Sequence, residues 1–501
     1  MKKFSLILLF LVFMLLFGCT MEEGPISEST KYHITLVDGV TKEETEMVTS
    51  RIRIKAMNLD AELKEGYLLI GWQLGDIVYD TDAEIPVTDG MVLTSVWKEV
   101  ESYASFFEVG SIAKIEISAT DAITSKEDYV TGSISITDED TKLNNVPISI
   151  RLRGNSSLTC PKKSYKIKFD SKQDLFGFGK DKEWALIANY FDPAMVRNFY
   201  AYRLAKAMGM EFAVDCKYAE VYLNGDLLGL YLVCETVKTG SNRVDIEADY
   251  DENATDIPFL LELDFKMISE SDPESNGIEN TDYFMMDLRS LGGKNYPIAC
   301  KYPKTYKKIT KTQYENLKNE VYNAFVSTKN KTYADYFDVD SLVDYFIIQE
   351  LFMNIDLDHS SVFFYKKMGE KIKMGPVWDF DISVGNANYV NNYSYDVLMK
   401  NVNGGSFLLN NLLKDQAFKT KYINRLKELQ QEILPAMFAS FEATYRALET
   451  YELRDNGVWH NLFAEYWPKP DYLVGPTYYQ QVIYVRYYLQ KHAEAMLELI
   501  K

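Results

Sequence analysis

The sequence predicts an α+β protein in which a small β module precedes a larger domain with two lobes. Three observations support this fold class. Residues 31–99 alternate apolar and polar side chains with a period of two, later segments up to residue 263 continue the strand pattern, and helical spacing dominates from Tyr314 onward. Strands first and helices later are typical of α+β architecture. The 501 residues are enough for roughly two to four domains.

The composition indicates a folded and acidic protein. Hydrophobic residues make up 47% of the chain and aromatic residues 14%, which argues against disorder. The formal net charge of -19 does not favour nucleic acid as a partner. The 14 Pro and 26 Gly are too few for a collagen-like or proline-rich fibre. Only four His residues occur, and their scatter disfavours a His-based metal site or a Ser-His-Asp triad.

The N-terminus has the features of a bacterial secretory signal. Lys2 and Lys3 precede an apolar run over residues 6–17, which is shorter than the ~20 residues a spanning helix needs. The run ends in Leu-Phe-Gly-Cys, which resembles a lipobox and implies that Cys19 carries a lipid. We therefore expect a signal peptide over residues 1–18, a tether over 19–30, and a lipid-anchored, extracytoplasmic protein. A plain signal peptide and an uncleaved anchor helix are the alternatives.

The four remaining cysteines lack the spacing of a metal site. Outside the cytoplasm four cysteines can form two disulfides, and Cys216 and Cys234 flank one predicted hairpin as candidate cross-strand partners. Buried free thiols are the alternative for all of them: Cys160, Cys216, Cys234 and Cys300.

Residues 31–99 form the predicted β module. Strands are expected around Ile34, around Ile54, over the segment GYLLIGW at 66–72 and over MVLTSVW at 91–97. This order resembles the Listeria-Bacteroides repeat, which implies a β-grasp-like spacer or adhesion module without an active site. Trp72 and Trp97 are expected in its core.

The larger domain is expected over residues 105–501. Alternation predicts strands around 115–119, 146–152, 165–169, 184–188 and 259–263, and Asn224-Gly225 predicts a hairpin turn between strands at 219–223 and 227–233. Asp192 and Pro193 predict a helix start, with Gly209 after its end. Asp340 is expected to cap a helix over 342–353, and residues 478–500 are expected to form a closing amphipathic helix.

One group of residues suits phosphate binding. Arg153 ends a strand, Asn155 and Ser156 follow in a Gly/Ser-rich turn, and Lys163 and Lys166 come just before and within the next strand. Such a turn offers backbone N–H groups, and the lysines offer positive charge. A solvated strand face that carries lysines for solubility is the alternative.

A second group suits a divalent cation. Asp356 and Asp379 lie 23 residues apart and are joined by a predicted two-strand hairpin, which can bring both carboxylates to one site. Carboxylate oxygens suit Mg²⁺, and Ser361 and Asp381 offer further oxygens nearby. An Asp followed five residues later by a metal-binding side chain is the spacing of a kinase catalytic loop. Glu235, at a strand end, is a candidate partner for a phosphate-binding lysine or a surface charge.

These motifs together resemble the spore coat protein H (CotH) family of atypical kinases. The resemblance rests on segments that occur in the family's order from about residue 110 to the C-terminus: RLRGNSS, KKSYKIKFD, KEWALIANYFDPAMVRN, VYLNGDLLGLYLVCE, FLLELD, NIDLDHSSVFFYKK and GPVWDFDISVGN. It implies a diverged protein-kinase-like fold that uses ATP with Mg²⁺ or Mn²⁺. The implied partners are Ser or Thr residues of envelope or spore-coat proteins.

The resemblance also assigns roles. It implies that Asp356 is the catalytic Asp, that Asp379 is the main metal ligand, and that Lys166 or Lys163 contacts the phosphates of the nucleotide. Ser361 departs from a common Asn, which leaves the second metal contact open, with Asp358 a possible substitute. Four further positions match the family with a role that is either functional or structural: Arg153, Asn155, Arg197 and Asp381.

Two functions from different classes follow. The first is a surface-anchored, metal-dependent protein kinase, which the Asp356 and Asp379 pair favours. The second is a non-catalytic surface protein with a kinase-like fold, which the adhesin-like module, Ser361 and the scarcity of ATP outside the cell favour. A carboxylate-pair hydrolase is less favoured, because it leaves the lysine-bearing strand without a role.

Overall fold

The computed structural model describes residues 30–56, 59, 67–81, 83–99, 101–266, 283–303 and 309–501. The signal sequence, Cys19 and nearly all of the tether lie outside these residues. No helix within the described ranges has the length and apolar character needed to cross a bilayer. The chain divides into two compact units, one of Met1–Glu62 with Leu69–Lys98 and one of Leu63–Leu68 with Glu99–Lys501.

The first unit is built from β-strands. Its main sheet has the order β2-β1-β7-β4-β5, with β1 (Tyr32–Val37) and β7 (Met91–Glu99) parallel; the other strands are β2 (Glu44–Thr49), β4 (Tyr67–Leu74) and β5 (Ile77–Asp80). A second pair joins β3 (Arg53–Lys55) and β6 (Glu84–Pro86).

Trp72 is buried, as the sequence predicts. Trp97 is only half-buried and its ring N–H donates to Ser95 Oγ at 2.7 Å, so its expected place in the core is wrong.

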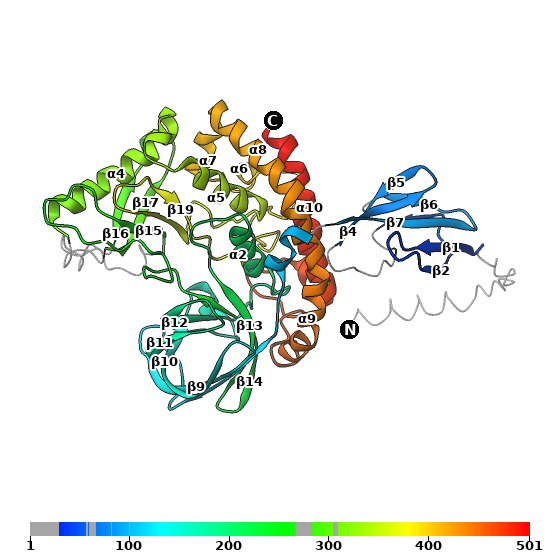
Figure 1. Ribbon diagram of the computed structural model, residues 1–501, viewed down its shortest axis with the longest axis horizontal. Helices are drawn as coiled ribbons and strands as arrows, with labels where there is room; N and C mark the ends of the chain where they lie inside the picture. The colour runs from blue at the N-terminus through cyan, green and yellow to red at the C-terminus, as the bar shows by residue number, and fades with distance from the viewer. Residues whose placement is uncertain are drawn as a thin grey trace, which may run out of the picture. The chain divides into compact units, whose positions relative to one another are not determined.

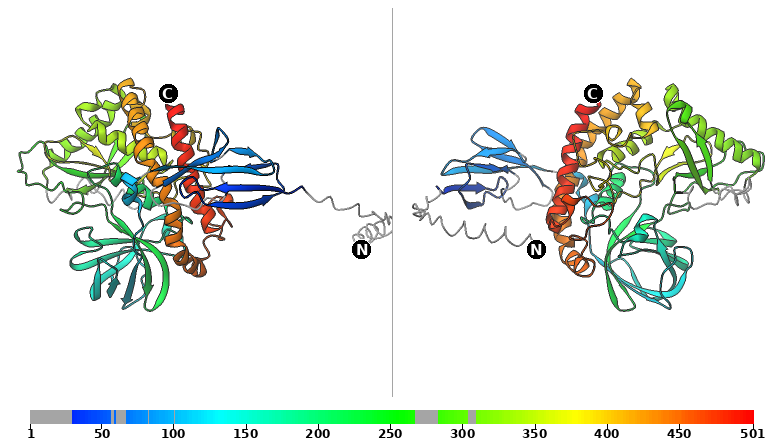
Figure 2. Two further views of the ribbon diagram at one scale, coloured as in Figure 1. Left: turned by 45° about the vertical axis from the view of Figure 1, so that its right-hand side comes forward. Right: turned by 180° about the vertical axis from the view of Figure 1, so that it is seen from behind.

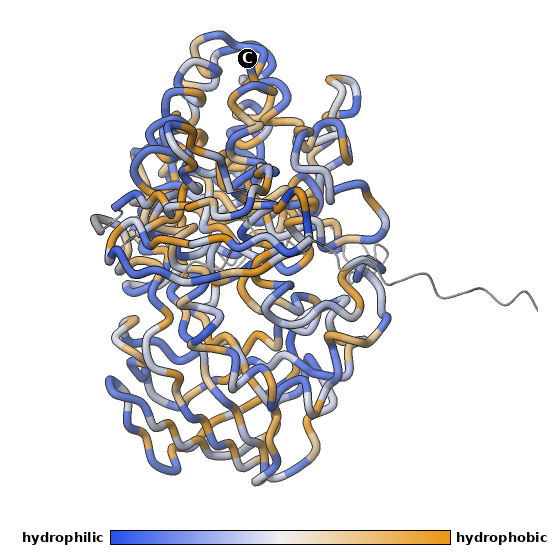
Figure 3. The backbone as a smooth tube through the Cα atoms, turned by 90° about the vertical axis from the view of Figure 1, so that its right-hand side faces the viewer, coloured by the Kyte–Doolittle hydropathy of each residue, from blue (hydrophilic) through white to orange (hydrophobic). Residues whose placement is uncertain are grey.

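The second unit begins with a closed seven-stranded barrel. Its order is β10-β11-β12-β14-β13-β8-β9, from β8 (Ala113–Ala119), β9 (Val130–Thr137), β10 (Lys142–Arg153), β11 (Ser164–Asp174), β12 (Lys180–Ile187), β13 (Cys216–Leu223) and β14 (Asp226–Glu235). Alternate residues of each strand belong to one apolar core, for example Ile115 and Ile117 of β8. Figure 3 shows short apolar and polar stretches interleaved along the chain. Asn224 and Gly225 adopt positive φ in the predicted hairpin turn.

A five-stranded sheet and most helices make up the rest of this unit. The sheet order is β16-β17-β15-β18-β19, from β15 (Phe259–Leu263), β16 (Tyr283–Asp287), β17 (Asn295–Tyr302), β18 (Val362–Lys366) and β19 (Lys373–Met374). Figure 1 shows α4 (Lys311–Asn330) beside this sheet. The short 3-10 helices are Glu101–Phe107, Ser156–Thr159, Arg289–Leu291, Tyr333–Asp335 and Asp471–Leu473.

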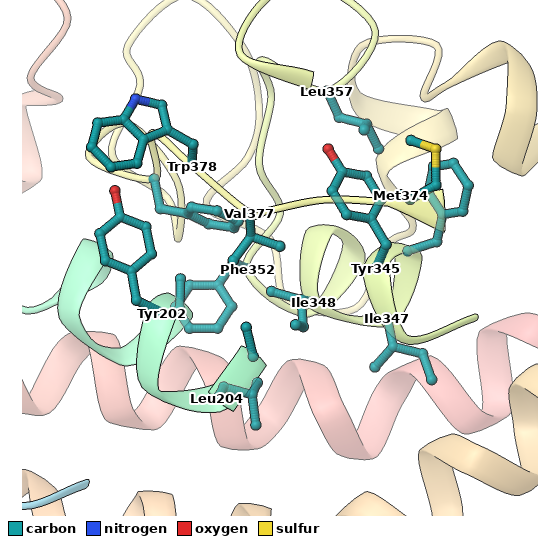
Figure 4. Packing of buried hydrophobic residues seen from close by; sticks show 14 of the residues in the cluster. Tyr202, Leu204, Tyr345, Ile347, Ile348, Phe352, Leu357, Met374, Val377 and Trp378 are labelled. Carbon is teal, nitrogen blue, oxygen red and sulfur yellow. The ribbon is translucent and has the colours of Figure 1, made fainter. Parts of the chain in front are cut away.

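Helices dominate the C-terminal half, as the sequence predicts. After α5 (Val339–Leu351) come α6 (Met399–Val402), α7 (Phe407–Leu412), α8 (Gln416–Glu432), α9 (Leu434–Trp459) and α10 (Tyr478–Ile500). The long helices α9 and α10 lie side by side in both views of Figure 2. Most residues of α5 are buried, and Figure 4 shows Ile347 and Ile348 in one cluster with Leu204 of α2 (Arg197–Ala207).

Two expected helix starts are wrong. Helix α5 is capped by Asp338, which accepts from the Ser341 N–H at 2.9 Å, while Asp340 lies in the first turn. Helix α2 begins at Arg197, because the carboxylate of Asp192 binds the Arg197 N–H at 2.8 Å and the Arg197 guanidinium. Asp192 and Asp340 do lie near helix starts, as expected. Contacts in the folded chain decide which carboxylate caps each helix.

The four described cysteines are buried free thiols. Cys216 and Cys234 lie directly opposite each other on β13 and β14, so the expected neighbourhood is confirmed while no disulfide joins the described residues.

Candidate functional site

A polar cleft of about 430 Å³ brings together the segments that the sequence analysis singled out. One wall comes from the barrel, where β10, β11 and the turn between them contribute Arg153, Asn155, Ser156 and Lys166. The other wall comes from the segments before β18 and after β19, with Asp356, Ser361, Asp379 and Asp381. Positively charged side chains therefore face carboxylates across one cavity.

Asn354 joins the two carboxylate segments. Its side-chain oxygen accepts the Asp356 N–H at 3.3 Å, and its amide nitrogen donates to the Asp379 carbonyl at 3.4 Å. Asn354 is buried directly after α5, so it fixes the two loop segments on either side of the β18–β19 hairpin. The sequence analysis missed this residue, although its place two residues before Asp356 was a usable signal.

The backbone at this site adopts conformations that side chains rarely favour. Asp379 has φ 67° and Ser361 has φ 59°, and each such position costs on the order of 1–3 kcal/mol. The Ser361 hydroxyl donates to Asp379 Oδ2 at 3.2 Å. The contacts made by Asn354 and Ser361 thus hold the Asp379 carboxylate in a set orientation despite its strained backbone.

Three carboxylates repel one another in this cleft. Burial, followed by the charge of Asp379, raises the pKa of Asp356 to about 7. Burial, followed by the charges of Asp379 and Asp356, raises the pKa of Asp381 well above its ordinary value. The positive charge of Lys266 opposes both shifts. A cation placed among these groups would relieve the repulsion.

The donor set fits a magnesium-like ion. Among the residues that the structure describes, no group of three or more His, Cys, Asp or Glu side chains is arranged to enclose a metal by itself. Mg²⁺ commonly binds through one or two carboxylates and completes its shell with water and substrate phosphates. Asp379 and Asp381 supply such oxygens, so these residues suit an ion that arrives with a phosphorylated ligand.

The opposite wall of the cleft is basic, and neighbouring side chains hold its charged groups in place. Lys166 Nζ lies 3.0 Å from Glu183 on the neighbouring strand β12. Burial lowers the pKa of Lys166, and the charge of Glu183 opposes that shift. The Arg153 guanidinium lies 5.3 Å from the centre of the Trp378 ring, across the cleft. Glu183 is thus the partner that holds Lys166, a role for which the sequence offered Glu235 as a candidate, with a surface charge as the alternative.

A loop between β8 and β9 covers the turn after β10. The Leu152 N–H donates to the Ser125 carbonyl at 3.0 Å, the Arg151 guanidinium donates to the Lys126 carbonyl, and Lys126 Nζ donates to Asn155 Oδ1 at 3.3 Å. Lys126 thereby joins the basic wall. The sequence analysis did not find this loop, because nothing in residues 120–129 marks them as neighbours of residue 155.

Three predicted residues lie away from the cleft lining. Lys163 precedes β11, and its amine donates to the carbonyls of Leu158 and Cys160, each at 2.6 Å, so it stabilises the preceding turn. Glu235 is paired with Arg243 and accepts from the Asp215 N–H at 2.9 Å. It lines a second cavity of about 330 Å³.

Asp358 is the third of these residues. Its carboxylate lies 3.0 Å from Lys294 Nζ and accepts from the Tyr296 hydroxyl at 3.0 Å. It also accepts from the Phe407 N–H at 3.0 Å. These contacts occupy Asp358 outside the cleft lining, so it does not substitute for the Asn that Ser361 replaces.

Helix α2 positions the segment that carries Asp379 and Asp381. The Arg197 side chain is fully buried and donates to the carbonyls of Ser383 at 2.9 Å and Val384 at 3.1 Å. Its guanidinium also pairs with Asp192. Arg197 therefore has a structural role, since it connects the start of α2 to the loop after Asp381.

Two more residues of α2 support the same segment. Asn198 Oδ1 accepts the Phe380 N–H at 2.8 Å, and the Tyr202 ring stacks on Trp378 with centroids 5.5 Å apart and an angle of 11° between the planes. Figure 4 shows Tyr202 and Trp378 side by side. Both neighbours of Asp379 in the chain are thus held by one helix.

Strand β15 adds charges that the sequence analysis did not assign. Glu262 lies in the cleft wall with its carboxylate 2.5 Å from Lys301 Nζ on β17. Burial raises the pKa of Glu262, and the charge of Lys301 opposes this shift. Asp264 and Lys266 follow at the end of the strand and also line the cleft. The segment FLLELD indicated a buried strand, but its neighbours across the sheet were not predictable.

Comparison with known proteins identifies the family. A search of curated proteins returns no significant match. The family model described as CotH kinase protein matches residues 150–496, which is more than half of the chain and includes the carboxylate wall and the turn after β10. The chain therefore belongs to the CotH kinase protein family.

Proposed function

We propose that this protein is a metal-dependent kinase that transfers the γ-phosphoryl group of ATP to Ser or Thr residues of other proteins. The observation that carries the proposal is the single cleft in which the basic side chains of Arg153 and Lys166 face the carboxylates of Asp356 and Asp379. Phosphoryl transfer needs positive charge for the phosphates and carboxylates for the metal and for the attacking hydroxyl. Membership of the CotH family supports the same assignment.

The roles follow from position. Asp379, with Asp381 beside it, would hold Mg²⁺ or Mn²⁺, which neutralises the phosphate oxygens when bound. Asp356 lies in the same cleft and would accept the proton of the acceptor hydroxyl while the bond between that oxygen and the γ-phosphorus forms. The bond to the leaving oxygen of ADP breaks in the same transfer.

The turn after β10 would hold the phosphates. Gly154 adopts φ 103° and is followed by Asn155 and Ser156, so consecutive backbone groups border the cleft beside Lys166. Turns of this kind bind anions through their N–H groups. Lys166 would add a charge whose position is set by Glu183.

The proposed location is the outer face of the bacterial cell membrane, with Cys19 lipidated and the substrates among envelope or spore-coat proteins. This part of the proposal rests on the signal-like sequence of residues 1–19. The same feature supports a second candidate function, a non-catalytic surface protein that keeps the kinase-like cleft, because ATP is scarce outside the cell.

Labelled ATP separates the two functions. The purified protein is incubated with γ-labelled ATP and Mg²⁺ or Mn²⁺, with and without a mixture of envelope proteins as acceptors. The kinase proposal expects metal-dependent label on the protein itself or on an acceptor, and no label with the Asp379→Asn variant. Asp226→Asn, an exposed change in the β13–β14 hairpin, is the matched control and should label like the parent. ATP binding without any transfer would favour the non-catalytic function.

A further inference from the structure

Two large, exposed aromatic side chains stack on each other, and one of them lines the cleft. Trp467 lines the cavity that holds Asp356 and is 55% exposed, and Tyr389 is 49% exposed. Their rings stack, with centroids 5.6 Å apart and an angle of 19° between the planes. Aromatic side chains of this size usually gain stability by burial, so an exposed stacked pair at a cleft suggests a binding surface.

The pair lies beside the carboxylate wall. Trp467 lines the same cavity as Asp356 and Asp381, and its ring packs edge-on against Phe191, another residue of the lining, with centroids 6.3 Å apart. Partial burial raises the pKa of Tyr389, and the charges of the same two carboxylates raise it further. The phosphate-binding residues proposed above lie on the barrel wall, so Trp467 borders the cleft from a loop other than those proposed to hold the phosphates.

The support beneath the rings is rigid. The Asn388 N–H donates to the Pro468 carbonyl at 2.8 Å, which joins the two loops that carry the rings. The Lys469 side chain is buried, and its amine donates to the carbonyls of Asn461, Leu462 and Ala464 at 2.6–3.1 Å. The loops therefore hold the rings in place although solvent reaches them.

The exposed charges on the two loops that carry the rings have one sign. On segments 386–397 and 460–478, the exposed residues among Asp, Glu, Lys and Arg are Asp396, Glu465 and Asp471, and the one lysine there, Lys469, is buried. The cleft itself also holds basic side chains, of which Arg153 and Lys166 lie on the barrel wall and Lys266 follows β15. An acidic residue packed on the two loops would still be repelled by the carboxylates of these loops. An uncharged or basic ligand would meet no such penalty.

We propose that Tyr389 and Trp467 form a platform that holds the acceptor polypeptide and places its hydroxyl group beside Asp356. This inference rests on the proposed kinase function and assigns it an acceptor site. The occupant is an extended polypeptide whose residues on either side of the phosphorylated Ser or Thr pack on the two rings. These flanking residues are not acidic, because the loops that carry the rings expose carboxylates. Tyr389 and Trp467 are positioning residues that do not touch the transferred group.

A library of synthetic peptides tests the platform. Each peptide carries one central Ser with one varied flanking position, and phosphate incorporation is measured with the parent protein, Trp467→Ala, Tyr389→Ala and Trp467→Phe. The parent should reject Asp and Glu at flanking positions and show a preference of at least about fivefold at one of them. Both Ala variants should lose that preference and raise the peptide KM about tenfold or more, with a smaller change in kcat. Trp467→Phe, which keeps an aromatic ring, should restore most of the affinity.

Two controls make the result decisive. Tyr479→Ala removes an exposed aromatic side chain of α10 that does not line the cleft, and should match the parent. ATP affinity, measured by calorimetry, reports whether the Ala variants keep a folded nucleotide site. A parent that phosphorylates no peptide and no protein overturns the proposed function itself. A parent that phosphorylates peptides with KM and preference unchanged in both Ala variants overturns only the platform, as would transfer to a polysaccharide acceptor in preference to every peptide.

Discussion

Asp356 and Asp379 share one cleft but are held differently. Asp379 has a positive φ and receives the Ser361 hydroxyl, whereas Asp356 is held through its backbone N–H by Asn354. Asp379 and Asp381 place two carboxylate groups on one short segment of the cleft lining, where we propose that a cation binds. The geometry separates a carboxylate suited to hold a metal from one suited to meet the acceptor.

Single substitutions should separate these two roles. Asp379→Asn should weaken ATP binding about tenfold or more in the presence of Mg²⁺, because the principal metal ligand loses its charge. Asp356→Asn should leave that affinity within about twofold and lower turnover by roughly 10²–10⁴, since it removes a general base. Calorimetry and single-turnover transfer measure the two effects. Equal loss of affinity in both variants would contradict the division of roles.

At the residue level, the sequence predicted more of the carboxylate wall than of the basic wall. Asp356 and Asp379 follow from two local motifs joined by one hairpin, so their meeting depends on short-range geometry. The partner of Lys166 depends on which strands are neighbours and in what register. β11 pairs with β12, which places Lys168 opposite Glu183 and leaves Lys166 within reach of it, whereas Glu235 turns to Arg243.

At the level of elements, helix α9 is fastened to the barrel by a buried ion pair. Lys162 Nζ lies 2.5 Å from Asp455 Oδ1, and the same oxygen accepts the Leu230 N–H at 2.8 Å. Gly229 has φ 101°, and a Cβ there would lie 2.0 Å from that oxygen, so only glycine permits the approach. Removal of one partner from such a pair typically costs about 3–5 kcal/mol, which makes this contact a main link between α9 and β14.

Glu452, one turn before Asp455 on α9, should make stability depend on pH. It is buried, and burial followed by the charge of Asp455 raises its pKa to about 7. Between about pH 4.5 and 7 the folded state therefore binds more protons than the unfolded state, so this group lowers the free energy of unfolding as pH rises through that window.

Replacement of Glu452 by Gln tests this dependence. Glu452→Gln should be more stable than the parent at pH 8, by roughly 0.5–3 kcal/mol, and the difference should vanish near pH 4.5. Urea unfolding at both pH values measures it. Glu432→Gln, an exposed change at the end of α8, is the control that should show no such trend. A Glu452→Gln variant that is less stable than the parent at pH 8 would show that the carboxylate is stabilising in its charged form.

The predicted helices and strands agree best with the structure where a local sequence pattern is enough to specify them. The expected hairpin at Asn224-Gly225, the strand at Phe259–Leu263 and the closing helix at Tyr478–Ile500 are confirmed. The starts of α2 and α5 were wrong, because Asp192 is bound by Arg197 and because Asp338 competes with Asp340 for the same cap. Each of these wrong helix starts depends on a contact that the spacing of apolar residues in the sequence does not predict.

At the scale of the whole molecule, the mixed α+β composition is confirmed, but the closed barrel was not foreseen. Closure needs β8 to pair in parallel with β13, which lies about a hundred residues later in the chain. The alternating pattern of each strand is the same in an open sheet and in a barrel. Strand order is therefore the part of the fold that could not be predicted from this single sequence.

Membrane attachment remains a prediction about the whole chain. We expect Cys19→Ala to move the protein from the membrane fraction to the soluble fraction or to leave it uncleaved, because the proposed lipid would be attached to the Cys19 sulfur. Fractionation of cells that express the parent or the variant, with immunoblotting for size, measures the effect. Cys160→Ala, a change of a buried thiol in the larger unit, is the control and should fractionate like the parent. A Cys19→Ala protein of parent size that stays in the membrane fraction would contradict a lipid anchor.

The two units should also be separable in function. The described residues that line the cleft fall between Lys126 and Trp467, so deletion of residues 31–99 should leave ATP affinity within about twofold of the parent. The deletion also removes Leu68, which belongs to the core of the larger unit, and this should lower its free energy of unfolding by about 1.5–3 kcal/mol. Calorimetry with Mg²⁺-ATP and urea unfolding measure the two effects, and a second deletion that retains residues 63–68 should recover the stability. A loss of affinity in both deletions, with stability recovered in the second, would show that the first unit contributes to the nucleotide site.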